Sequence, residues 1–465
     1  MLVSHDALDL LGFPGRTLVT AVTALGALPP GPSLPAALQT AAWVVAPWEF
    51  MQRCAARYGD VFTVRLAGEK PWVMVSHPDA VKEVFTGPAE LLHAGEANRI
   101  LLPVVGANSV LLLDDDAHRQ QRRLLMPPFR GNRLASYAGT MTAVAQAEIA
   151  RWPQGRPVRL LPRMQALTLE IILRAVFGLS EGPRLDQLRT ELVRAAWTTT
   201  ARIGQLFFVL GPRHEAAQLI RSRFRRVDEL LYAEIDERRR AERLDERGDV
   251  LSMLLQARHE DGRPMSDVEI RDELMTLLTA GHDTTATALS WAVERLVRHP
   301  EYQARLTEEI QTGDHQFCDA VVKEALRLRP VLSVVGRRLK APMEIGGASL
   351  PAGVVVVPSI YLMHRRPDIY PEPNRFQPER FLEQRAGTYT WIPFGGGVRR
   401  CLGAAFAEYE MRIVLGALFG RCMVRPRNAG PEPVRRRGIM HVPGRGATVV
   451  LGPVNRPTGD PLKLV

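Results

Sequence analysis

The spacing of hydrophobic and polar positions predicts a chain that is mostly helical. From residue 117 to about residue 240, apolar side chains recur with a helical period, with breaks at MPPF, PQGRP and LGP. The pattern also predicts a long helix over residues 266–298, in which Ser266 and Glu269 have the spacing of a capping box. Further helices are expected over residues 320–328 and directly after Cys401, in LGAAFAEYEMRIVLGALFG.

Strand-like runs are short and flank the helical region. Residues 61–66 and 72–75 are rich in β-branched and aromatic side chains, and AGEKP between them predicts a hairpin turn. Other strand-like runs lie in APMEIGGASLPAGVVVVPS and GATVVLG, and a Pro-rich meander, RRPDIYPEPNRFQPERF, precedes a glycine-rich loop. The predicted fold class is therefore mainly α with small β-sheets.

The pattern predicts one large domain. The chain has 465 residues, and no Gly/Ser-rich tract, long charge block or internal repeat interrupts the apolar pattern between about residues 43 and 450. We expect an N-terminal extension over residues 1–27 and a single domain over residues 28–465. The apolar run 17–28 is shorter than the roughly 20 residues that span a bilayer, so no transmembrane anchor is expected. No basic segment precedes it, as a signal peptide requires, and a peripheral membrane contact through it stays open.

Charge and cysteine content exclude several classes of protein. The net charge is +10, but the arginines are scattered, without zinc-finger spacing or an RNA-binding aromatic motif, so nucleic-acid binding is not expected. An acidic protein partner on a basic face stays open. Four widely spaced cysteines (Cys54, Cys318, Cys401 and Cys422) argue against a disulfide framework or a structural zinc site, and favour a reducing cytoplasm.

One cysteine lies in an unusual loop, FGGGVRRCLG. Three consecutive glycines allow the chain to fold tightly against a flat or large group. Cys401 directly precedes a helix and is flanked by Arg399 and Arg400, which favours the thiolate, a soft metal ligand and an axial ligand of haem iron. A phosphate cradle, a catalytic nucleophile and a buried structural thiol are alternatives. However, GGGVRR lacks the third glycine of GxGxxG and the P-loop lysine, and no histidine motif lies nearby.

The loop resembles a known signature. Phe394, Gly397, Arg399, Cys401 and Gly403 match F-x-x-G-x-R-x-C-x-G, the haem-binding motif of the cytochrome P-450 family. The resemblance extends from about residue 28 to the C-terminus. It implies the cytochrome P-450 fold as a single catalytic domain, and haem b (iron protoporphyrin IX) as cofactor. It also implies Cys401 as the axial iron ligand, with Phe394 and Gly403 beside the cofactor.

A second motif lies within the long predicted helix, in LTAGHDTTATALSW. Gly281 costs about 1 kcal/mol relative to Ala in a helix interior, which indicates a packing or functional reason. Thr284 can donate to the carbonyl of residue 280 and loosen the helix there. Resemblance to A-G-x-D-T-T implies that Thr284 and Asp283 deliver protons for cleavage of the O–O bond, that Ala280 and Gly281 lie against the haem, and that His282 points away.

The resemblance assigns a role to two further groups of charged residues. Glu324 and Arg327, alone, read as a routine surface pair worth tenths of a kcal/mol. The family's E-x-x-R motif instead implies a buried triad with Arg380, which would fix the meander and the cysteine loop.

The helix containing DDDAHRQQRRLLMPPF carries His118 and Arg122 on one face, four residues apart. The resemblance implies that both donate to the haem propionates. Arg399 is a third expected propionate partner and Arg337 a fourth, with Arg338 as its alternative. The alternative for each is a basic residue on a solvated face.

The resemblance implies a monooxygenase that inserts one atom of dioxygen into a hydrophobic small molecule. Residues 86–113 and 195–220 are apolar and are expected to shape its pocket, which suits a fatty acid, steroid or terpenoid equally well. Electrons from NAD(P)H would arrive through a separate reductase and a ferredoxin or flavodoxin, with Arg399, Arg400 and Arg412 as a basic docking face. Two alternatives are a peroxide-driven or rearranging haem-thiolate enzyme, which the intact Asp283–Thr284 pair argues against, and a non-catalytic haem sensor.

Overall fold

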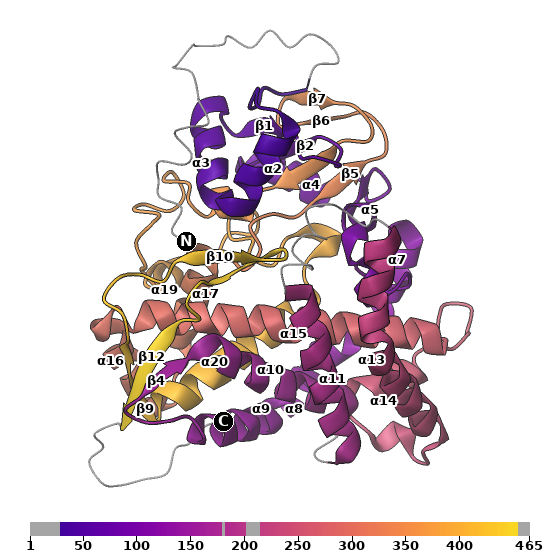
Figure 1. Cartoon of the computed structure of the whole chain (residues 1–465), viewed down its shortest axis with the longest axis vertical. Coiled ribbons are helices and arrows are strands. Elements are labelled where there is room, and N and C mark those ends of the chain that lie inside the picture. Colours follow the sequence, from indigo (N-terminus) through magenta and orange to yellow (C-terminus); the bar gives the residue numbers. More distant parts are fainter. Residues whose placement is uncertain (1–27, 179–181, 201–213, 454–465) are drawn as a thin grey trace.

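Helices dominate the computed structural model, which describes residues 28–178, 182–200 and 214–453 (Figure 1). This confirms the mainly α prediction. The α-helices are α2 (Ala36–Val45), α3 (Pro47–Tyr58), α4 (Pro78–Thr86), α5 (Ala94–Ala97), α6 (Leu102–Val105), α7 (Asp115–Leu125), α8 (Asn132–Ser136), α9 (Ala138–Ala150), α10 (Leu160–Phe177), α11 (Pro183–Thr200), α13 (His214–Arg240), α14 (Val250–Gln256), α15 (Asp267–Leu296), α16 (Pro300–Thr312), α17 (Gln316–Leu328), α18 (Ile360–Met363), α19 (Arg380–Glu383) and α20 (Ala404–Phe419). Short 3₁₀ turns are η1 (Arg99–Leu101), η2 (Pro127–Phe129), η3 (Leu244–Glu246) and η4 (Gly397–Arg399).

The strands form small sheets. The largest has the order β1-β2-β8-β5-β3, in which β2 and β8 are parallel and the other pairs are antiparallel. A second sheet has the order β4-β12-β9, and two hairpins join β6 to β7 and β10 to β11. The strands are β1 (Val61–Val64), β2 (Trp72–Val75), β3 (Leu92–His93), β4 (Pro157–Arg159), β5 (Arg337–Leu339), β6 (Met343–Ile345), β7 (Ala348–Leu350), β8 (Val355–Pro358), β9 (Cys422–Pro426), β10 (Val434–Arg437), β11 (Met440–Pro443) and β12 (Thr448–Pro453).

Helix α15 crosses the helical part of the molecule and packs along α10 (Figure 1). It begins at the predicted capping box. The Ser266 hydroxyl accepts the backbone N–H of Glu269 at 3.3 Å, and the Glu269 carboxylate accepts the backbone N–H of Ser266 at 2.7 Å. These bonds satisfy N–H groups that the first helical turn leaves without an intrahelical partner.

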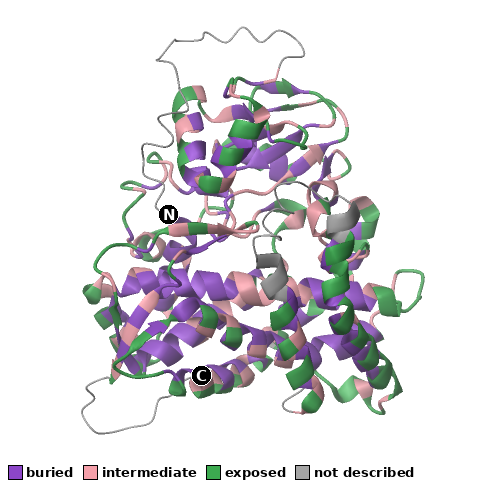
Figure 2. Cartoon of the chain, viewed as in Figure 1, coloured by how far each residue is buried: buried purple, intermediate pink, exposed green. Residues whose placement is uncertain are grey.

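Buried apolar side chains form one large cluster among α9, α10, α15, α17 and α20. Smaller clusters lie between the five-stranded sheet and α4, and between that sheet and α2 and α3. In Figure 2 the central helices are buried along most of their length, while the outer helices alternate between buried and exposed positions. The candidate site described below therefore lies on elements held by the main core.

Most other expectations about local structure are confirmed. The predicted hairpin pairs Val61 with Val75 and Val64 with Trp72. The segment after Cys401 forms α20, residues 320–328 belong to α17, and GATVVLG contributes to β12. The predicted extension, residues 1–27, lies outside the described residues, as does the 201–213 part of the expected pocket segment 195–220. Within the described ranges, no helix combines the length and apolar character needed to cross a membrane.

We predict that Ser266→Ala lowers the free energy of unfolding by about 1 kcal/mol, the usual cost of losing an N-cap side chain. Guanidinium unfolding followed by far-ultraviolet circular dichroism measures this change. Ser349→Ala, at an exposed position of β7, is the matched control. Equal stability of the two variants would contradict a stabilising role of the capping box.

Candidate active site

The cysteine loop runs from Phe394 to the start of α20. The backbone N–H of Cys401 donates to the carbonyl of Phe394 at 2.9 Å, which closes the loop. Gly397 has a φ of +64°, and a β-carbon there would lie 1.9 Å from the carbonyl oxygen of Phe85 in α4. A β-carbon on Gly396 would lie 2.1 Å from the Phe85 ring. The close approach that these glycines permit is therefore made to α4.

Part of the Cys401 side chain is exposed to solvent, but protein atoms surround the sulphur closely enough to desolvate it. Desolvation raises the pKa of the thiol, while the N–H of Gly403 and the charges of Arg122 and Arg400 lower it. The net direction is upward. The helix end and Arg400 favour the thiolate, as expected from the sequence, but desolvation of the sulphur outweighs them. Coordination to a cation deprotonates a thiol outright, so a bound metal ion would supply the stabilisation that Cys401 lacks.

The four residues expected at the propionates lie together. Burial, followed by the nearby charges of Arg399, Arg122 and Arg337, lowers the pKa of His118 to about 3. Arg337 is buried beside Arg399, and desolvation followed by that repulsion lowers its pKa to about 10. Grouped positive charges out of water are costly unless an anion accompanies them. The cluster therefore fits a group that carries two carboxylates, as haem does.

The bonding partners of Arg399, Arg337 and Arg338 differ, and they indicate which of these residues can bind a propionate. Arg399 donates to the carbonyls of Val110 at 3.3 Å and Leu113 at 2.5 Å, and pairs with Asp114 at 2.5 Å. Arg337 donates to the carbonyl of Gly336, its own neighbour. Arg338 lies 3.9 Å from a carboxylate oxygen of Glu96. Arg337 is thus the better candidate of the two for a propionate. Asp114 was not selected from the sequence as the partner of Arg399, although Asp114 begins the DDD run at the start of α7.

The oxygen-side motif lies in the middle of α15. The Thr284 hydroxyl donates to the carbonyl of Ala280 at 2.6 Å, as expected from the sequence. Thr284 is half-buried and Ala280 is exposed. A β-carbon on Gly281 would lie 3.3 Å from Ile172 of α10, so the small residue serves the packing of the two helices. His282 directs its ring to the carbonyl of Leu278, 2.6 Å away in its own helix.

Asp283 is held by two residues that reasoning from the sequence did not select. Its Oδ1 lies 2.6 Å from a guanidinium nitrogen of Arg437, at the end of β10, and accepts a hydrogen bond from Gln165 of α10 at 2.5 Å. Burial raises the pKa of Asp283, but the charges of His282 and Arg437 and the Gln165 bond outweigh it, so the pKa is lowered. The carboxylate is ionised at neutral pH and is bonded away from Thr284.

Glu324, Arg327 and Arg380 form a network. Both side chains of the Glu324–Arg327 pair are fully buried, with nitrogen–oxygen distances of 2.6 and 2.8 Å. Arg380 lies 3.6 Å from Glu324. Arg327 also donates to the carbonyls of His364, Pro373 and Arg375, in the meander.

The network reaches the cysteine loop through His364. Burial, followed by the charges of Arg327 and Arg365, lowers the pKa of His364, so its ring is neutral. Its Nε2 accepts the backbone N–H of Ile392 at 2.9 Å, and the carbonyl of Ile392 accepts the N–H of Gly395 at 3.0 Å. The buried pair is thus connected to the first glycine of the loop.

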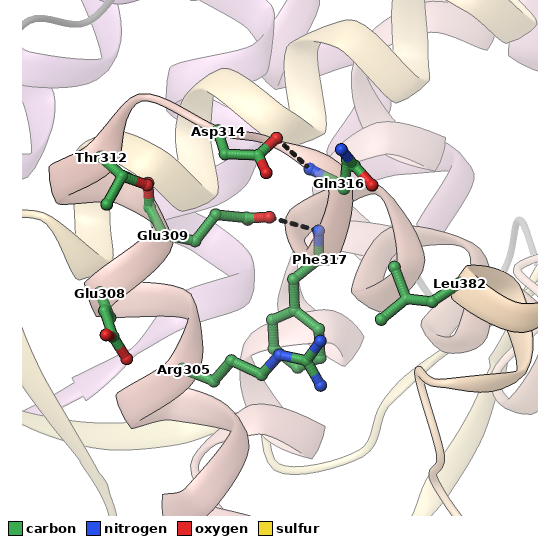
Figure 3. A pocket seen from close by; sticks show the side chains of 8 residues that line it. All are labelled: Arg305, Glu308, Glu309, Thr312, Asp314, Gln316, Phe317 and Leu382. Atoms are coloured by element: carbon green, nitrogen blue, oxygen red, sulfur yellow. Dashed lines mark hydrogen bonds between the residues drawn. The ribbon is translucent and has the colours of Figure 1, made fainter.

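A surface hollow of about 400 Å³ lies elsewhere, between α16 and α17 (Figure 3). Glu309 accepts the backbone N–H groups of Phe317 and Cys318 there, and Arg305 lies over the Phe317 ring at 4.2 Å. The hollow contains none of the predicted site residues. Its carboxylate already caps the start of α17, so we assign the hollow a structural role.

The fold and this site define a haem-binding protein with a cysteine ligand loop. The sequence profile of the family described as Cytochrome P450 matches residues 28–448. Cytochrome P450 135B1 of Mycobacterium tuberculosis is 43% identical over 432 residues, covering 91% of each chain. Cytochrome P450 135A1 of the same organism is 40% identical over 433 residues, covering 92% of this chain and 96% of the relative. The chain belongs to the cytochrome P450 family.

Solved structures agree with this assignment. The structure described as retinoic acid bound cyanobacterial CYP120A1 has a TM-score of 0.79 and 25% identity, covering 92% of this chain and 99% of that one. The cytochrome P450DA heme domain has a TM-score of 0.78 and 22% identity, covering 92% and 97%, and supports the fold. The protein is therefore a haem-dependent monooxygenase that acts on organic substrates with dioxygen and redox partners.

We predict that Glu324→Ala lowers the free energy of unfolding by about 3–5 kcal/mol, because it leaves Arg327 charged and unpaired in the core. The purified variant should contain little haem, as measured by its absorbance relative to protein. Glu324→Gln gives a milder loss and guards against complete misfolding. Glu229→Ala, which removes an exposed i,i+3 pair with Arg226, is the control. Normal haem content in both Glu324 variants would show that haem retention does not depend on this network.

Proposed function

We propose that this P450 inserts one oxygen atom into a hydrophobic small molecule of the fatty acid, steroid or terpenoid class. We further propose that Cys401 is its axial iron ligand. The observation that carries the proposal is the grouping of three arginines (Arg122, Arg337 and Arg399) around His118, next to the loop that presents Cys401. Arg122 joins the two parts, because its charge acts on both His118 and Cys401 and it donates to the carbonyl of Arg400 at 2.8 Å.

When bound, the haem supplies an iron centre that binds dioxygen and accepts electrons. In this proposal His118, Arg122, Arg337 and Arg399 bind its propionates, and Phe394, Gly403, Ala280 and Gly281 border it. Burial and the neighbouring arginines lower the pKa of His118 and so favour the neutral ring, which still offers one N–H donor. The arginines remain protonated and supply the positive charge.

Asp283 and Thr284 are the proposed proton-delivery pair. Thr284 holds a proton on Oγ1, which it donates to the carbonyl of Ala280. Asp283 is ionised, and the bonds to Arg437 and Gln165 both occupy its Oδ1, so Oδ2 is the oxygen proposed to accept a proton from water. Arg437 is proposed to keep Asp283 ionised, because its charge lowers the pKa of that carboxyl group.

The substrate class rests on apolar composition and on one relative. Residues 86–113 contribute Asn108 and Val110, which contact the start of α15, so this segment borders the helix that carries Thr284. The CYP120A1 structure is described with bound retinoic acid, an apolar molecule with one carboxylate. A similar apolar ligand is proposed here.

Electrons are proposed to come from NAD(P)H through a separate reductase and a ferredoxin or flavodoxin. The predicted docking face needs correction. Arg399 is largely buried and paired with Asp114, and Arg412 forms two hydrogen bonds with Asp319 at 2.7 and 2.6 Å. Arg400 is exposed, so it is the residue of the three that is available to an acidic partner. A cytoplasmic location and a peripheral membrane contact remain predictions.

The optical spectrum of the reduced protein with carbon monoxide tests the ligand. We expect the long-wavelength Soret band of thiolate-ligated haem, and its loss in Cys401→Ser. Cys422→Ser, which changes a buried thiol in β9, should keep the band. A band at shorter wavelength in the unmodified protein would contradict thiolate ligation by Cys401.

Thr284→Ala should retain haem but divert reducing equivalents to hydrogen peroxide, because the proton on Oγ1 is lost. The ratio of peroxide formed to NAD(P)H consumed should rise several-fold in the presence of substrate. Thr287→Ala is the matched control, since Thr287 makes the same type of bond, to the carbonyl of Asp283 at 2.8 Å. Equal coupling in Thr284→Ala and the unmodified protein would remove Thr284 from proton delivery.

A further inference from the structure

Two consecutive carboxyl groups of α15 bind the segment 106–113, which connects α6 to α7. Asp272 accepts the backbone N–H and the side-chain amide of Asn108, both at 2.9 Å. Glu273 accepts the backbone N–H of Val110 at 2.8 Å. A β-carbon on Gly106 would lie 2.0 Å from Asp272 Oδ1, so the segment is closely fitted to these side chains.

Glu273 also connects the two elements that carry the basic cluster. The N–H of Val110 donates to Glu273, and the carbonyl of the same residue accepts Arg399 at 3.3 Å. On its other side Glu273 lies next to Gln121, whose side chain lowers the Glu273 pKa, although Gln121 Nε2 has no hydrogen-bond partner among the described residues. Gln121 lies in α7 directly before Arg122 and one turn after His118. A single carboxyl group therefore contacts both the segment that holds Arg399 and the helix that holds the other two residues.

The surroundings of Glu273 disfavour a negative charge. Its side chain is fully buried, and Oε2 has no hydrogen-bond partner among the described residues. The segment 106–113 offers it a backbone N–H, and α7 offers the neutral Gln121. The charges that act on it from α15 are those of Asp272 and Glu269, both acidic. Arg271 is occupied by Asp272 at 2.8 Å and by Asp228 of α13 at 2.5 Å.

Burial, with a smaller contribution from Asp272 and Glu269, raises the pKa of Glu273 to about 8. Glu273 is therefore neutral at pH 7. An ionised carboxylate at this position would be buried without a cation, which is unfavourable.

We propose that neutral Glu273 is a positioning residue that fixes segment 106–113 and α7 for haem binding, and that its ionisation releases them. The inference rests on the proposed function, because it takes the haem propionates as the partners of Arg399, His118 and Arg122. Glu273 acts through Val110 and Gln121 and does not itself contact the cofactor in this proposal.

The direction of the pH effect follows from linkage. In the fixed state Glu273 keeps its proton up to about pH 8, whereas in a released, solvated state it ionises near the ordinary value of about 4.3. Between these values, raising the pH favours release by at most about tenfold per pH unit. Above about pH 8 both states are ionised, and Glu273 adds no further change.

The test measures the rate of haem transfer from the holoenzyme to excess apomyoglobin between pH 6 and pH 9. We compare the unmodified protein with Glu273→Gln, which keeps an acceptor for Val110 but cannot ionise. The rate of haem loss from the unmodified protein, divided by the rate for Glu273→Gln, should rise by roughly 3- to 10-fold per pH unit up to about pH 8. Above that pH the ratio should level off. The carbon monoxide spectrum at each pH shows that the thiolate ligand is intact.

Glu410→Gln is the matched control. Glu410 in α20 is a second buried carboxyl group with a pKa raised by desolvation, and its Oε1 also has no partner among the described residues. This variant should keep the pH dependence of haem loss seen in the unmodified protein. Glu273→Leu cannot accept the backbone N–H of Val110. It should therefore lose haem faster than Glu273→Gln at every pH.

A rate ratio that is independent of pH in haem-loaded protein would overturn the positioning role of Glu273. The same change of ratio in Glu410→Gln would also overturn it, because the effect would then belong to any buried acid. Unmodified protein that contains no haem, or that lacks the thiolate band, would instead contradict the proposed function.

Discussion

The buried Glu324–Arg327 pair is the interaction on which the cysteine loop depends. Removing two charges from water is costly, and the cost is offset only when the remaining donors and acceptors are satisfied. Here the planar guanidinium of Arg327 meets both carboxylate oxygens of Glu324 and three carbonyls of the meander. The meander has no regular secondary structure over most of its length, so these bonds take the place of a helix or sheet. Through His364 and Ile392 the same bonds determine where the loop begins.

The loop that results is electrostatically incomplete without a cofactor. Positive charges gather around His118, and the desolvated thiol of Cys401 has a raised pKa. In the proposed arrangement a haem would offset both costs at once, because its propionates are anionic and its iron would stabilise the thiolate. The charges and the burial of these residues therefore favour an anionic group that carries a metal ion.

Helix α15 performs several tasks along its length. Its first turn is capped, its next carboxyl groups hold segment 106–113, and its middle carries Thr284 and Asp283. Gly281 allows α10 to approach closely at the level of the motif. The first half of α15 thus contacts the basic cluster through one intermediate residue, Val110, which bonds to both Glu273 and Arg399.

The sequence alone determined the local structure and the chemical class of the site. Residues close together in the chain form the helical period, the Ser266 capping box, the β1–β2 hairpin and the cysteine motif. Such patterns can be recognised in the sequence alone. The i,i+4 bond of Thr284 is local in the same sense.

Tertiary structure decided the partners that lie far apart in the chain. Sequence spacing did not indicate that Phe85 packs on Gly397, that Arg437 pairs with Asp283, or that Glu273 binds Val110. It indicated groups near Cys401 that lower the pKa of the thiol, but not the desolvation that raises it, because a motif shows neighbouring charges and not the loss of water around the sulphur. Desolvation and the choice among many possible partners are set by packing of the whole chain, and for that reason only the folded molecule reveals them.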